Sequence, residues 1–281
     1  MLENFSRSWL LVKASGKVLL QDRELIFFPL FSALASLLLL ASFAAPLIAS
    51  DAFGNVFHGG LSHVEVLLFG CLFYLGQYLI VFFFNTALIG AAMIRLEGGD
   101  PTISDGLAIA RSKFTSILGY ALIAATVGIA LRMIEERVGV IGKLISGSLG
   151  IAFSVATFLT VPVLVSRDVG PIEAINESAA LLKKTLGQNI IGNAGMGLVF
   201  GLLYALLVFS GIAVFAAAVA TTSAALFGVV LALIVLVILL ALVHATLQGV
   251  YSAALYRFAT AGGDTDSFPG TLLQSAFNGK S

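Results

Sequence analysis

The chain has 281 residues, of which 59% are hydrophobic and only 11% are charged, and its formal net charge is zero. Soluble domains carry roughly a quarter charged residues, so this composition excludes an ordinary soluble protein. The balanced charge argues against a nucleic-acid-binding protein, and the single cysteine, Cys71, excludes an intramolecular disulfide.

Six apolar stretches are long enough to cross a bilayer, which requires about 20 residues per helix. In chain order they cover residues 25–48, 64–94, 114–133, 144–165, 190–220 and 224–258. The second and fifth are each roughly 46 Å long as helices, so they must tilt, kink or extend into the headgroup region. The sequence predicts an all-α, polytopic membrane helical bundle of six transmembrane helices, forming a single membrane domain over residues 1–281.

The distribution of basic residues predicts the orientation of these spans. With the N-terminus in the cytoplasm, 12 of the 15 lysines and arginines lie on the cytoplasmic side, and only Arg132, Arg137 and Lys143 lie outside. By the positive-inside rule, both termini are cytoplasmic. A signal peptide is the competing interpretation of the N-terminus, but the 24 residues before the first apolar stretch are too long and too mixed in charge.

A repeated pattern precedes the first, third and fifth spans. Each preceding segment has apolar residues spaced four and three apart, which is typical of one face of an amphipathic helix. The three stripes are Phe5, Trp9, Val12, Gly16 and Leu19; Ile103, Leu107, Ala110, Phe114 and Ile117; and Ile175, Ala179, Leu182 and Leu186. The predicted unit is therefore an interfacial helix followed by a transmembrane hairpin. It occurs three times, over about residues 1–95, 96–166 and 167–262, and a short tail follows at 263–281.

One basic residue lies at the same register in each copy: Lys13, Arg111 and Lys183. Interfacial helices lie in the headgroup plane with their apolar face toward the acyl chains and their basic side chains toward phosphates. These three residues are therefore predicted to bind lipid headgroups. The alternative is that the helices only fix the topology and pack on the bundle.

Polar residues within the spans are the other candidates. Gln77, Asn85, Asn193, His244 and Gln248 would line a polar path, or would join helices by hydrogen bonds. No catalytic, cofactor-binding or metal-binding residue is predicted. The group Asp51, His58, His63 and Glu65 lacks a known ligand spacing, and no Asp, Glu, Lys or Arg lies in the middle of a span.

Two sequence segments carry a family resemblance. They are Gly170–Ser178, continuing through Leu182, Lys183 and Lys184 to Asn189, and the opening Ser8 and Trp9 through Lys13, Leu19 and Asp22 to Leu30. They resemble an uncharacterised prokaryotic family of six-span integral membrane proteins and, more distantly, the membrane domain of some glycerophosphodiester phosphodiesterases. The resemblance implies a multi-pass protein of the plasma (inner) membrane. It supplies no catalytic residues, and the acidic metal ligands of the phosphodiesterase domain have no counterpart here.

These observations favour a non-enzymatic integral membrane protein that organises lipid or partner proteins through cytoplasmic amphipathic helices. The expected partners are membrane lipids, with a second copy or another membrane protein as further candidates and without nucleic acid or a cofactor. The alternative function is a transporter or channel for a small neutral or lipidic molecule, since internal repeats are common in transporters.

Overall fold

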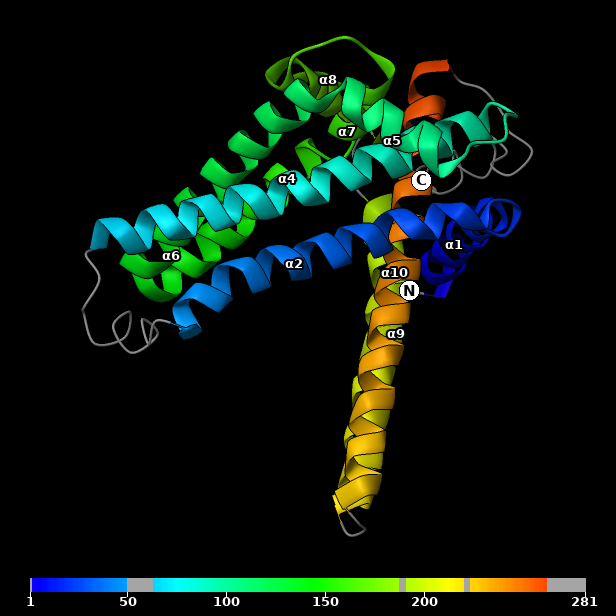
Figure 1. Ribbon diagram of the computed structural model, residues 1–281. Helices are drawn as coiled ribbons and strands as arrows, with labels where there is room; N and C mark the ends of the chain where they lie inside the picture. The colour runs from blue at the N-terminus through cyan, green and yellow to red at the C-terminus, as the bar shows by residue number, and fades with distance from the viewer. Residues whose placement is uncertain (1, 50–62, 187–190, 220–222, 262–281) are drawn as a thin grey trace. The chain divides into compact units, whose positions relative to one another are not determined.

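The structure of the chain is helical throughout the part that it describes. The computed structural model describes residues 2–49, 63–186, 191–219 and 223–261, and these ranges contain helices and no strand (Figure 1). The predicted C-terminal tail, residues 263–281, lies outside them. The all-α prediction is therefore confirmed for the described residues.

Helices long and apolar enough to cross a membrane account for most of this structure. Five such segments are present among the described residues: Arg23–Ala45, Leu68–Leu96, Phe114–Arg137, Gly142–Ser166 and Phe227–Thr260. The predicted fifth span corresponds to α9, Ile191–Val219, in which the apolar segment Val199–Phe215 is shorter. These segments support the prediction of a multi-pass membrane protein, whereas the number six stays a prediction.

The three segments predicted to precede spans are all helices. They are α1 (Leu2–Gln21), α5 (Ile103–Ser112) and α8 (Pro171–Leu186). Helix α5 begins with a capping box, in which the Asp105 N–H donates to Thr102 Oγ1 at 3.2 Å and the Thr102 N–H donates to Asp105 Oδ2 at 2.9 Å. This pair satisfies two backbone donors at the helix start that have no partner within the helix.

The predicted stripe of the second segment is interrupted. The spacing predicts one helix from Ile103 to Ile117, but α5 ends at Ser112 and α6 (Phe114–Ala156) begins after a turn at Lys113. The φ and ψ angles of Lys113 are −100° and 12°, outside the helical range. Phe114 and Ile117 therefore belong to the start of the third span and not to the helix before it.

The 43-residue segment α6 is not one straight helix, because the chain reverses direction between Glu135 and Ser146. The Ser146 hydroxyl donates to Glu135 Oε1 at 2.6 Å, whereas 11 residues of straight helix span about 16 Å. A Cβ added at Gly150 would likewise lie 3.7 Å from Leu131 Cδ1. The third and fourth spans therefore form a hairpin, as the sequence predicts.

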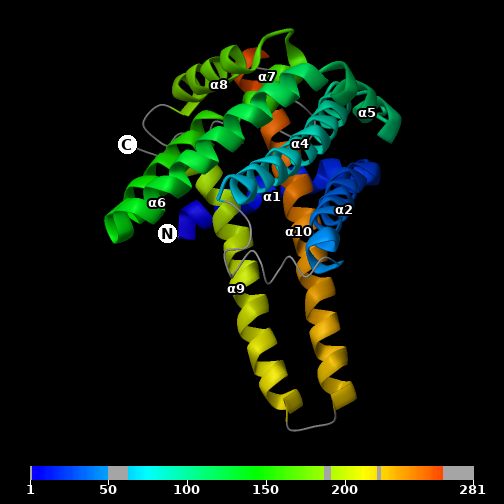
Figure 2. The same ribbon diagram turned by 60° about the vertical axis from the view of Figure 1, so that its left-hand side comes forward.

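The chain divides into two compact units that are not contiguous in sequence. The first unit comprises residues 1–26, 92–100 and 183–281, and the second comprises residues 27–91 and 101–182. In the first unit, α1 packs on α9 and α10 (Ser223–Ala261), which lie side by side (Figure 2). The short 3-10 helix η1 (Arg23–Ile26) contacts α1 and α10. The second unit contains α2 (Phe27–Ala49), most of α4 (His63–Leu96), and α5 to α7.

Close helix contact in the second unit depends on small residues. A Cβ added at Gly106 of α5 would lie 2.5 Å from Phe28 Cζ and 2.7 Å from the Ala87 carbonyl oxygen. Both distances are shorter than real Cβ contacts, so glycine is required here for α5 to lie against α2 and α4. The sequence identified this segment as a helix but did not predict this contact.

Candidate functional site

The three predicted lipid-binding residues are all exposed. Lys13 lies in α1, Arg111 lies in the last turn of α5, and Lys183 lies in the last turn of α8. None of the ion pairs between described residues includes any of them. Lys13 and Lys183 belong to the first unit and Arg111 to the second. Each is therefore available to a negatively charged group at the surface of its own helix.

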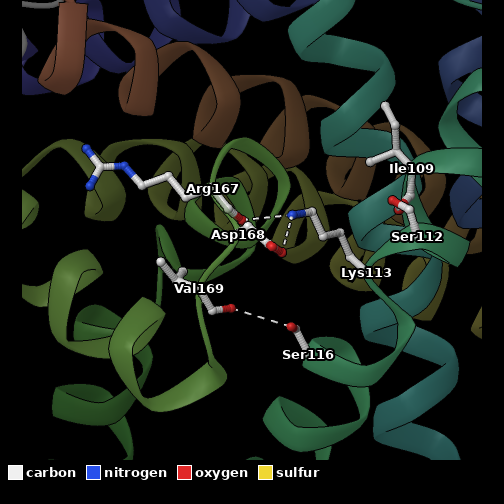
Figure 3. A network of polar contacts seen from close by, with 7 residues as sticks. All are labelled: Ile109, Ser112, Lys113, Ser116, Arg167, Asp168 and Val169. Carbon is white, nitrogen blue, oxygen red and sulfur yellow. Dashed lines mark hydrogen bonds and ion pairs between the residues drawn. The ribbon is translucent and has the colours of Figure 1, made fainter.

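A neighbouring basic residue, Lys113, instead helps to hold the second unit together. Lys113 Nζ donates to the Arg167 carbonyl at 2.9 Å and forms an ion pair with Asp168 Oδ1 at 3.3 Å (Figure 3). In the same network, Ser116 Oγ donates to the Val169 carbonyl at 3.4 Å. The Lys113 side chain is only 19% exposed. This network attaches the connector between α7 (Thr160–Ser166) and α8 to the start of α6, so Lys113 has a structural role.

The buried faces of α5 and α8 share a register. Gly106 and Ala110 are buried in α5, and Ala174, Ser178 and Leu182 are buried in α8. In the alignment of the predicted repeat, Gly106 corresponds to Ser178 and Ala110 to Leu182. Arg111 directly follows Ala110, and Lys183 directly follows Leu182. Both basic residues therefore lie at the same edge of the buried face of their helix.

The fourth span contains an interruption that the sequence analysis did not anticipate. Helix α6 ends at Ala156, and α7 begins at Thr160. Pro162 is the third residue of α7; in an uninterrupted helix it would have no N–H to donate, and its ring would clash with the carbonyl four residues earlier. A proline inside an apolar stretch was therefore the sequence signal for this break.

Ser178 of α8 satisfies two of the backbone groups that the interruption leaves without helical partners. The Phe158 N–H bonds to the Val155 carbonyl, and the Thr160 N–H bonds to the Thr157 carbonyl. These bonds occupy the Val155 carbonyl and the Thr160 N–H, which in a regular helix would bond to the Leu159 N–H and the Ala156 carbonyl. Ser178 Oγ accepts from the Leu159 N–H at 3.0 Å and donates to the Ala156 carbonyl at 2.7 Å.

A small polar group surrounds this interruption. Thr157 and Thr160 are buried, and the hydroxyl of Tyr120 lies beside both of them. The Tyr120 ring stacks on Phe82, with 4.3 Å between ring centroids. The second unit therefore contains hydroxyl groups next to an interrupted span, and interrupted spans occur at the binding sites of many transporters.

The predicted polar-path residues have separate environments. In the second unit, Gln77 Nε2 donates to Ser36 Oγ at 2.9 Å, and Asn85 is half-buried. The Gln77 contact joins α4 to α2, so it matches the alternative in which polar residues join helices. Whether Asn85 lines a path stays a prediction.

The other three candidates lie in the first unit. The His244 ring stacks on Phe200, with 4.2 Å between centroids and 11° between planes, and this contact joins α10 to α9. Gln248 is exposed, and the side chain of Asn193 lies outside the described part of the structure. The His244 contact is likewise a helix-joining one.

A buried acidic residue lies where α1 meets η1. Asp22 is 6% exposed, and its Oδ2 atom has no hydrogen-bond partner among the described residues. Burial raises the pKa of Asp22, and Arg95 partly opposes this effect. Arg95 also donates to the Gly99 carbonyl and pairs with Asp100 Oδ1, both at 3.1 Å. Among the described residues, no three His, Cys, Asp or Glu side chains form a metal site.

Comparison with known proteins gives one match. Residues 63–266 match the model of a family of unknown function (DUF6159), which confirms the expectation of an uncharacterised family. No curated protein and no solved structure matches the chain. The comparisons therefore show no link to glycerophosphodiester phosphodiesterases.

Proposed function

Because the chain belongs to DUF6159, a family of unknown function, we propose a function from its own residues. The protein is a non-enzymatic, six-span integral membrane protein built from three repeats. It binds anionic lipid headgroups at the cytoplasmic face through Lys13, Arg111 and Lys183. Membrane lipids are its partners, and both of its termini are cytoplasmic.

The observation that carries this proposal is the exposure of all three basic side chains. Lys113, Arg167, Arg95, Arg132 and Arg257 are paired with acidic residues, so their charges are partly neutralised. Lys13, Arg111 and Lys183 belong to none of these pairs. A basic residue near an anionic leaflet contributes about 1 kcal/mol to binding, so three together correspond to roughly a hundredfold or more in lipid affinity.

The test is charge reversal of all three residues together. The K13E/R111E/K183E variant is expected to lose co-purifying phosphatidylglycerol and cardiolipin, which the unaltered protein retains in a fixed ratio. Native mass spectrometry of protein released from membranes counts the lipids bound per chain. The readout is independent of any transport or enzyme assay.

The matched control reverses basic residues on the other predicted side of the membrane. Arg137 and Lys143 are also exposed, so R137E/K143E changes charge without changing the cytoplasmic helices. This control is expected to retain lipid. Equal lipid retention by the triple variant and the unaltered protein would contradict the proposal, and would assign the three residues to topology alone.

A second candidate function is passage of a small neutral or lipidic molecule. The interrupted fourth span, with buried Thr157 and Thr160 beside Tyr120, is the observation that favours it. Ser178 already satisfies two backbone groups of the break, so headgroup binding is the better supported of the two functions. If the unaltered protein retains no anionic lipid, transport becomes the leading candidate function.

A further inference from the structure

A carboxyl group and a guanidinium group of the first unit interact electrostatically but do not bond to each other. Asp22, between α1 and η1, is 6% exposed, and its Oδ2 atom has no hydrogen-bond partner among the described residues. Arg95, at the end of α4, acts on Asp22 electrostatically. Its Nη1 atom donates instead to the Gly99 carbonyl and to Asp100 Oδ1, both at 3.1 Å. All four residues belong to the first unit.

Both acidic and basic groups act on the Asp22 carboxyl. Burial has the largest effect on the pKa of Asp22 and raises it, whereas Arg95 lowers it. Two acidic side chains also raise this pKa, those of Glu24 and Asp100. On α10, which contacts η1, the charged residue is Arg257, and it pairs with Glu97 at 3.8 Å. Among the described residues, Arg95 is therefore the basic group that an ionised Asp22 attracts.

The two carboxyl groups near Arg95 gain different amounts from pairing with it. The Asp100 side chain is 96% exposed, and an ion pair at an exposed carboxylate contributes little, because water already solvates the charge. An ionised carboxylate that is buried without a partner is costly, whereas a neutral carboxyl in the same place costs far less. The present bonding therefore corresponds to the protonated form of Asp22, and ionisation makes Asp22 the stronger partner.

We propose that ionisation of Asp22 moves the Arg95 guanidinium from Gly99 and Asp100 to the Asp22 carboxylate. The guanidinium must move to reach it, because none of the ion pairs between described residues joins Arg95 to Asp22. Both present bonds share Nη1, so this movement breaks them and releases residues 97–100, the connector after α4. The chain passes from the first unit to the second directly after Asp100, so this link is sensitive to pH. The inference does not depend on the proposed lipid role.

Hydrogen exchange of the connector amides tests the release. The N–H groups of Glu97, Gly98 and Gly99 bond to carbonyls of the last turn of α4, so their exchange reports on local opening. At pH 7, these amides are expected to exchange several-fold more slowly in D22N, because asparagine has no charge to attract Arg95. The matched control is E24Q, which removes a negative charge two residues away and should exchange like the unaltered protein. Equal exchange in D22N and the unaltered protein, or the same slowing in E24Q, would overturn the proposal.

A double-mutant cycle tests whether Arg95 changes partner. R95Q, D100N and the double variant give the coupling between Arg95 and Asp100, measured by denaturant unfolding in mixed micelles at pH 7. With Asp22 present, this coupling is expected to be close to zero. In a D22N background it is expected to reach about 2- to 5-fold in the unfolding equilibrium constant, the range for an exposed ion pair. Coupling that is equal in the two backgrounds would refute the exchange of partners.

Discussion

At the scale of single residues, Ser178 is the clearest example of a polar side chain that completes a helix other than its own. Its hydroxyl is fully buried, and it bonds to two backbone groups, the Leu159 N–H and the Ala156 carbonyl, that lose their regular partners at the break before α7. An unsatisfied buried N–H or carbonyl costs about 1 to 3 kcal/mol. Ser178 therefore allows Pro162 to interrupt a span at little cost.

Replacement of Ser178 by alanine is expected to lower the free energy of unfolding by about 1 to 3 kcal/mol, because two buried groups lose their partner. Denaturant titration in mixed micelles measures the change. S148A is the matched control, since the exposed Ser148 hydroxyl donates only to the Leu144 carbonyl of its own helix. A loss in S178A no larger than that in S148A would contradict this role.

Combining S178A with P162A shows whether the proline causes the interruption. With alanine at 162 the N–H is restored and the helix can continue, so Leu159 and Ala156 regain helical partners. S178A is then expected to cost less in the P162A background than alone, by a double-mutant cycle. Additive effects would mean that the break does not depend on Pro162.

Because Asp22 is buried, the stability of the folded protein is expected to fall as Asp22 ionises. Burial raises its pKa in the folded protein, so folding favours the protonated form. The ionised form therefore lowers stability at neutral pH, and this penalty disappears as the pH falls through the raised pKa. D22N is expected to gain stability relative to the unaltered protein at pH 7 and to lose this gain toward pH 4. A difference between the two that does not change with pH would contradict this assignment.

At the scale of elements, the position of α5 depends on a helix start and a glycine. The Thr102 and Asp105 capping box starts the helix, and the hydrogen bonds from Thr102 lower the pKa of Asp105. Gly106, one residue later, then lies against Phe28 and the Ala87 carbonyl. The start of α5 is therefore set by its own sequence, whereas its place is set by contact with α2 and α4.

G106A is expected to destabilise the protein by about 1 to 3 kcal/mol, although alanine favours helix. A Cβ there would lie 2.7 Å from a backbone oxygen, and a backbone atom cannot rotate away as a side chain can. G147A in α6 is the control, because nothing lies within 4 Å of the added Cβ. It should be neutral or stabilising by up to about 1 kcal/mol. Thermal unfolding in detergent distinguishes the two, and equal midpoints would exclude this contact as the cause.

At the scale of the whole molecule, the order of the helices in the chain differs from their grouping in space. The predicted repeat divides the chain into three consecutive pieces, whereas the two compact units combine segments that are distant in sequence. The first unit joins residues 1–26 to residues 183–281, so it cannot be complete before the last helix is made. We expect the second unit, residues 27–91 and 101–182, to be complete earlier during synthesis.

The sequence by itself determined the helices, their approximate ends and the membrane class. These properties are local, since apolar length and backbone hydrogen bonding within one segment decide whether it can span lipid. The exposed positions of Lys13, Arg111 and Lys183 also follow from helical spacing within each segment. The turn at Lys113 was not predicted, because the apolar spacing continues across it.

Only the tertiary structure decided which face of each helix is buried. The predicted stripe of α8 places Ile175 and Ala179 inward, but both are half-buried, while Ala174 and Ser178 are fully buried. In water, apolar residues mark the buried face. In a bilayer, lipid accepts them equally well, so close contact selects small residues instead. The hydrogen bonds between Ser178 and the interrupted span could not be predicted either, since they require two helices to be placed together.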